Sequence, residues 1–182
     1  MPKSPFATLT GAAWRGLTAP AFLLCLLSWS TPGAAQEADT EEDRVAVIET
    51  GAGVEHGSQG GSSRVGGAVG IEFTPIEHWL EIEFGFAAMH ASGSTELSGD
   101  LVFKKPFRLS PSSELMIGVG PFISRTVSGT PKDTTHGVEV ALDFMHWSAK
   151  DGGWYVEPSW SRTSGSGERT VGLTVGLLFG LP

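Results

Sequence analysis

Large apolar residues recur at every second position through most of this chain. In segment 78–89, for example, Leu80 and Ile82 alternate with Glu81 and Glu83. This period of two predicts a β-strand whose two faces meet different surroundings. Eight segments share it, namely 47–56, 64–74, 78–89, 95–104, 114–124, 137–147, 153–163 and 170–182. Because no stretch after position 45 shows a helical period, the sequence predicts an all-β domain.

The segments are joined by connectors rich in Gly, Ser, Pro and Asp, as turns are. They are 56–63, 74–78, 91–94, 104–113, 125–136, 148–153 and 163–168. Consecutive strands joined in this way form an antiparallel meander, and an even number of strands lets the first pair with the last. We therefore predict an eight-stranded antiparallel up-and-down transmembrane β-barrel over 45–182.

Two barrels fit this pattern, and they differ in which face of the strands is inside. A soluble lipocalin-like barrel hides its large apolar residues in the lumen, whereas a membrane barrel presents them to lipid. An eight-stranded lumen is only wide enough for side chains to fill it, and large apolar residues from all eight strands would overfill it. The sequence thus favours the membrane barrel without a measurable pore, and a soluble periplasmic carrier of the lipocalin kind is the alternative.

In this arrangement the charged residues of the strands line the lumen, where they can share water and counter-charges. The predicted lumen charges are Glu49, Arg64, Glu72, Glu81, Glu83, Glu96, Asp100, Lys104, Glu139, Asp143 and Glu157. Aromatic residues near strand ends are typical of the girdles at the two membrane interfaces. The predicted girdle residues are Trp79, Trp147, Trp154, Tyr155 and Trp160.

The strand pattern over 45–182 resembles that of the small, eight-stranded outer-membrane β-barrel proteins of Gram-negative bacteria. Members of this family typically end on an aromatic residue that the barrel-assembly machinery reads, with apolar residues at alternating positions before it, and Val175, Leu177 and Phe179 fit this pattern. The resemblance implies that this machinery is a partner during biogenesis and that outer-membrane lipid and lipopolysaccharide surround the barrel. It also implies periplasmic termini, with connectors 56–63, 91–94, 125–136 and 163–168 on the extracellular side.

The first 35 residues have the features of a signal peptide. Lys3 and Arg15 are basic, 19–29 is a short apolar core, and 33–35 ends in small residues that suit signal-peptidase cleavage. We predict export to the outer membrane and an acidic, flexible leader over 36–44. Cys25, the one cysteine of the chain, lies within the signal peptide, so we expect no disulfide in the exported protein.

Charge excludes one large class of function. The chain has 12 Lys and Arg against 20 Asp and Glu, and removal of 1–35 leaves a net charge of −10. Nucleic-acid binding requires clustered bases, so we expect none. We expect a monomer with no cofactor, and no metal site either, because the five histidines lack a metal-binding spacing.

The resemblance leaves one enzymatic alternative open, because small outer-membrane barrels include lipid A deacylases with a His-x-Ser pair and a Glu. In this chain His146, Ser148 and Glu157 are the weak candidates, although the family's pair lies on the penultimate strand. We favour a non-enzymatic protein with a structural or surface-interaction role in the cell envelope.

Overall fold

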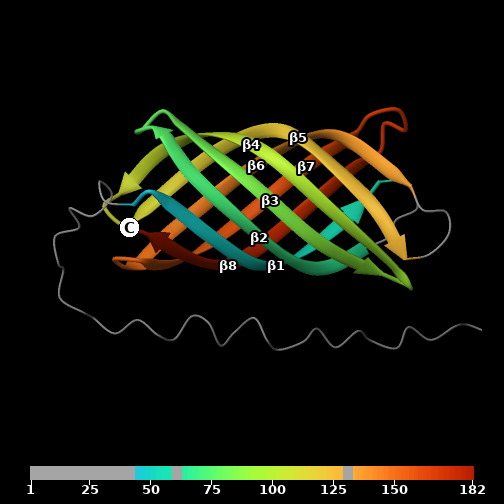
Figure 1. Ribbon diagram of the computed structural model, residues 1–182, viewed down its shortest axis with the longest axis horizontal. Coiled ribbons are helices and arrows are strands. Elements are labelled where there is room, and N and C mark those ends of the chain that lie inside the picture. The colour runs from blue at the N-terminus through green and yellow to red at the C-terminus, as the bar shows by residue number, and fades with distance from the viewer. Residues whose placement is uncertain (1–43, 59–62, 129–132) are drawn as a thin grey trace, which may run out of the picture. The chain divides into compact units, whose positions relative to one another are not determined.

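Eight antiparallel strands close into a single barrel in the computed structural model, which describes residues 44–58, 63–128 and 133–182. The strands are β1 (Ala46–Gly57), β2 (Ser63–Ile76), β3 (Leu80–Ala91), β4 (Ser94–Ser110), β5 (Ser113–Ser128), β6 (Thr134–Ala149), β7 (Gly152–Thr163) and β8 (Arg169–Leu181). Each pairs with its sequence neighbours, and they wind obliquely around the barrel (Figure 1). The predicted eight-stranded up-and-down topology is confirmed. The described residues contain no helix long and apolar enough to cross a membrane.

Pairing of the first strand with the last completes the wall. β1 and β8 are in continuous register from Ala46 opposite Leu181 to Gly57 opposite Thr170. Closure leaves no free sheet edge to bind another strand. We call the end that carries Ala46 and Leu181 the terminal end of the barrel, and the opposite end the loop end.

The strands extend further into two predicted connectors than expected. β4 continues to Ser110 and β5 begins at Ser113, so only two residues separate these strands. β5 in turn continues to Ser128, within the predicted connector 125–136. Pro106 lies within β4 opposite Met116, and the ladder continues on both sides of it. A proline lacks an N–H group, but β4 has no β3 partner beyond Lys104, so Pro106 lies where β4 pairs only with β5 and the missing donor does not end the strand.

A tight connection at the loop end, between β3 and β4, has clear turn chemistry. Ser92 and Gly93, between β3 and β4, both have positive φ values, 35° and 83°. Two residues of positive φ form the hairpin turn that matches the twist of the flanking strands. The predicted signal peptide, Cys25 and 36–43 of the predicted leader lie outside the described residues.

The outer wall of the barrel is apolar. Exposed side chains at alternate positions include Val65, Val69, Phe84, Phe86, Ile117, Val119, Val138, Val140, Leu173, Val175, Leu177 and Phe179. The positions between them point inward, and the core of the protein is therefore its lumen. This arrangement is the reverse of a lipocalin-like barrel, in which the large apolar residues line the interior.

Candidate functional site

The structure places all eleven predicted lumen charges on inward-facing positions of the wall. Glu49, Glu72, Glu81, Glu83, Lys104 and Asp143 are buried, and the other five are less deeply enclosed. Strand alternation accounts for their common direction, because residues two apart on a strand share a face. The buried and the less enclosed charges form two different environments along the lumen.

Lys104 is the centre of the buried group. Its Nζ lies 3.1 Å from Glu72 Oε2 and also forms ion pairs with Glu83 and Asp143. These carboxylates come from β2, β3 and β6, so one side chain of β4 links both sides of the lumen. The Lys104 side chain has no solvent exposure, and a buried charge of this kind is tolerated only when it is paired.

An apolar cluster lies in the same closed part of the lumen. Met116, Met145, Tyr155 and Leu178 pack together with almost no exposure. They come from β5, β6, β7 and β8, which lie next to one another in the wall. Among the described residues, long inward-facing side chains therefore occupy the lumen toward its terminal end.

Two residues predicted for the aromatic girdle belong to this interior instead. Tyr155 is only 3% exposed and packs in the apolar cluster. Trp147 packs against the same cluster, and the Arg44 guanidinium lies 3.6 Å from its ring centroid. The girdle prediction is wrong for both, because Tyr155 shares its strand face with Glu157 and Trp147 shares its face with Asp143. Trp79, Trp154 and Trp160 are exposed.

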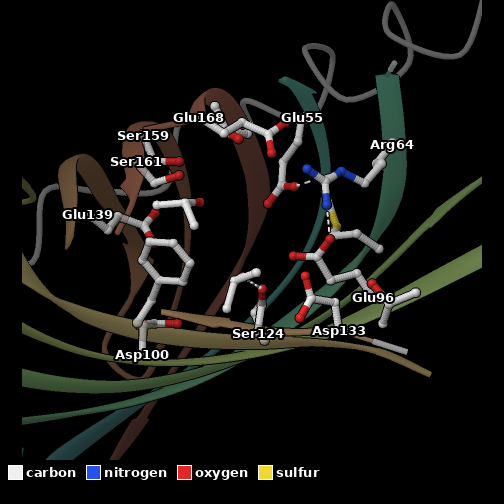
Figure 2. A pocket seen from close by; sticks show the side chains of 17 residues that line it. Glu55, Arg64, Glu96, Asp100, Ser124, Asp133, Glu139, Ser159, Ser161 and Glu168 are labelled. Atoms are coloured by element: carbon white, nitrogen blue, oxygen red, sulfur yellow. Dashed lines mark hydrogen bonds and ion pairs between the residues drawn. The ribbon is translucent and has the colours of Figure 1, made fainter. Parts of the chain in front are cut away.

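Toward the loop end the lumen opens into a polar cavity of about 230 Å³. Hydroxyl groups from Ser98, Ser124, Thr126, Thr135, Ser159, Ser161, Thr163 and Thr170 line it, together with Glu55, Glu96, Asp100, Asp133, Glu139 and Glu168. Figure 2 shows Arg64 reaching between Glu55 and Glu96. Its Nε lies 3.7 Å from Glu55 Oε2, and it forms an ion pair with Glu96. We call this space the loop-end cavity.

A second cavity of about 70 Å³ lies deeper in the lumen and has Glu49, Glu83, Tyr155 and Glu157 among its lining residues. Oxygens of the three glutamates lie within 4.8 Å of one another. Three carboxylates at this separation are ligands of the type that a hard cation uses. The predicted absence of a metal site rested on histidine spacing, which carries no information on carboxylates brought together from β1, β3 and β7.

The three candidates for a deacylase-like site do not come together. His146 lies opposite Trp154 on the outer face of the wall, and its Nδ1 is 2.9 Å from Ser113 Oγ. Ser148 is exposed and lies at an irregularity of the β6–β7 pairing between Trp147 and Ala149, whereas Glu157 points into the lumen. The barrel wall thus separates the imidazole from the carboxylate that would have to orient it.

Several lumen residues were absent from the sequence-based set. Glu55 borders the loop-end cavity, and Met116, Met145 and Leu178 fill the closed part. Their position was encoded in the alternation, since Met145 shares a strand face with Asp143. The predicted set contains only charged residues, so the apolar residues on the same strand face are missing from it.

A closed antiparallel barrel of eight strands, apolar outside and charged inside, has the architecture of the small outer-membrane barrels. No family model matches the chain, and no curated protein matches it in sequence. Solved structures do match its fold. Neisserial surface protein A aligns with a TM-score of 0.64 and 10% identity over 75% of this chain and 97% of the other.

Two further structures match in the same way. Ail, the attachment invasion locus protein of Yersinia pestis, has a TM-score of 0.54 at 10% identity, covering 75% of this chain and 97% of its own. The N-terminal β-barrel domain of Pseudomonas aeruginosa OprF has a TM-score of 0.55 at 13% identity, covering 75% and 98%. The chain therefore has the fold of small eight-stranded bacterial outer-membrane barrels.

Proposed function

We propose that this chain is an integral protein of the Gram-negative outer membrane, exported by its N-terminal signal peptide. The apolar outer wall carries this proposal. Side chains such as Phe84, Phe86 and Leu177 are about half exposed on a closed barrel. A continuous apolar surface of this extent is unfavourable in water and favourable against acyl chains.

We propose a non-enzymatic role, either structural or in surface interaction. The terminal part of the lumen supports it, because buried side chains such as Lys104 and Met116 occupy the space that a solute would have to cross. The separation of His146 from Glu157 also favours it over a deacylase-like activity. In this proposal the loop end is extracellular, so the loop-end cavity faces the surroundings of the cell.

The charge of the loop-end cavity narrows the kind of surface partner. A structure of Ail with the heparin analogue sucrose octasulfate matches this fold with a TM-score of 0.57 at 8% identity. In this chain Glu55, Asp133 and Glu168 are among six carboxylates that line the cavity with Arg64. We therefore expect a neutral or cationic partner at the cavity rather than a sulfated polyanion.

A different feature supports contact with lipopolysaccharide. Arg162 on β7 and Arg169 on β8 are directly opposite each other near the loop end, and both are exposed. Like charges in this position destabilise a sheet, and an anion between them would offset the repulsion. Trp160 and Val171 form the next outward-facing pair along the strands. The phosphates of outer-leaflet lipid fit this site.

Fractionation tests the proposed location. The full-length chain is expressed in a Gram-negative host, and the outer membranes are washed with carbonate and analysed by gel electrophoresis with and without boiling. We expect a carbonate-resistant band whose mobility changes on boiling, because a closed barrel resists detergent until it is heated. Release of the protein into the periplasmic fraction without detergent would contradict the proposal.

The arginine pair is tested in the same membranes by the amount of lipopolysaccharide that copurifies with the barrel. We expect the double variant Arg162→Gln, Arg169→Gln to retain less than the original chain. Lys105→Gln, at the terminal end, is the matched control and should retain the original amount. Equal retention in all three proteins would rule out the pair as a lipid-phosphate site.

A further inference from the structure

Three glutamates from separate parts of the sequence converge in the middle of the lumen. Glu49 lies on β1, Glu83 on β3 and Glu157 on β7, and each offers a carboxylate oxygen within 4.8 Å of the other two. Repulsion opposes such a cluster unless positive charge or protons compensate it. The three carboxylates therefore need a compensating charge close to them.

Glu49 provides an independent indication of a missing ligand. The residue is only 2% exposed, and its Oε1 is buried without a hydrogen-bond partner among the described residues. A buried carboxylate oxygen with no partner is unfavourable by more than a typical hydrogen bond contributes. The unpartnered carboxylate belongs to the three-glutamate cluster, so a cation bound there would satisfy it.

Lys104 does not supply the compensating positive charge for all three glutamates. Its Nζ pairs with Glu72, Glu83 and Asp143. Of the three clustered glutamates it contacts only Glu83 among its described ion pairs. Among the described residues, the carboxylates of Glu49 and Glu157 are therefore left without a basic partner at ion-pair distance.

The deeper cavity offers both space and access. Its volume of about 70 Å³ exceeds the share of one water molecule, roughly 30 Å³, so an ion and a small number of waters fit. It shares the lining residues Glu55, Ser98, Asp100, Glu139 and Ser159 with the loop-end cavity. A cation can thus enter from the loop end along a polar path that includes three carboxylates.

We propose that the barrel binds one divalent cation of the calcium type between Glu49, Glu83 and Glu157, with water completing its coordination. Calcium takes oxygen ligands at about 2.3–2.6 Å in flexible geometry, so two ligands on opposite sides of one ion are about 4.6–5.2 Å apart. The oxygens of the three glutamates lie within 4.8 Å of one another, so no two of them are further apart than two ligands of one calcium ion can be. Magnesium requires shorter distances of about 2.0–2.1 Å and retains more of its water.

Calorimetric titration with calcium chloride tests the site. The full chain is folded in non-ionic detergent without lipopolysaccharide, which would itself bind calcium, and is treated with a chelator before titration. Glu49→Gln removes one ligand charge without breaking an ion pair that the structure shows. Glu81→Gln is the matched control, because Glu81 is a buried glutamate on the same strand as Glu83 but outside the cluster.

We expect one calcium ion per barrel, affinity weakened by about tenfold or more in Glu49→Gln, and affinity within about twofold of the original in Glu81→Gln. Glu157→Gln should repeat the loss, and an unchanged heat-dependent shift in gel mobility shows that each variant is folded. If the original chain binds no calcium, or if Glu49→Gln and Glu157→Gln both fold and bind it as tightly as the original chain, the proposed site is wrong.

Discussion

The two halves of the lumen share one wall but differ in how they are filled. Near the loop end many of the inward-facing side chains are short hydroxyl side chains, such as Ser124, Ser159 and Ser161, and a cavity of about 230 Å³ remains. Toward the terminal end they are long, such as Lys104 and Met116, and the space is closed. The difference shows that strand alternation sets the direction of a side chain, while side-chain size decides whether the barrel is open or filled.

The largest expected effect on the free energy of unfolding comes from removing the positive charge of Lys104, at the centre of the closed half. Lys104→Met leaves Glu72, Glu83 and Asp143 without their common partner, and breaking a buried ion pair costs about 3–5 kcal/mol. We expect a corresponding fall in the free energy of unfolding, measured by urea titration of the barrel in lipid vesicles. Lys105→Met, on the next residue, is the control, and an equal fall in both would show that Lys104 has no special role.

A smaller effect is expected from shortening an apolar side chain in the closed half. Met116 is fully buried, so Met116→Ala should lower the free energy of unfolding by about 2–5 kcal/mol. Ser159→Ala, beside the cavities, should change it by no more than about 0.5 kcal/mol. The same urea titration measures both. Similar small changes at the two positions would mean that the closed half is not tightly packed.

The smallest expected effect on stability comes from alanine substitution of two glycines on the neighbouring strands β1 and β2. A methyl group on Gly51 would lie 2.6 Å from Tyr155 Oη, whereas one on Gly67 would meet nothing closer than 3.6 Å. Gly51→Ala should therefore destabilise the barrel by about 1–3 kcal/mol through overpacking. Gly67→Ala should be close to neutral in the same measurement. A Gly51→Ala barrel as stable as the original would show that the lumen has free space beside Tyr155.

The sequence predicted the fold well because the alternation that defines a strand also defines its two faces. The direction of the charged residues followed from the same pattern, as did the even number of strands. Contacts across the lumen did not follow from it. Lys104 meets Glu72 and Asp143 from strands that are not its neighbours, and such meetings depend on how the strands tilt when the barrel closes.

The errors in the sequence-based site have a common physical origin. Tyr155 and Trp147 were assigned to the lipid interface because of their residue type, although their strand positions already placed them inside. The clustering of Glu49, Glu83 and Glu157 could not be detected, because it depends on the height of each residue along the barrel. Residue type indicates which environment is favourable, but strand position decides which environment the side chain meets.

The most direct test of the account compares Trp154 with Trp147, which lie near the same end of the wall on opposite faces. Two variants that each retain one of these tryptophans, with the others replaced by Phe, are placed in vesicles that contain brominated lipid. We expect strong fluorescence quenching of Trp154, which is 40% exposed on the outer wall, and little quenching of Trp147. Equal quenching of both, or stronger quenching of Trp147, would contradict the assignment of the outer face to lipid.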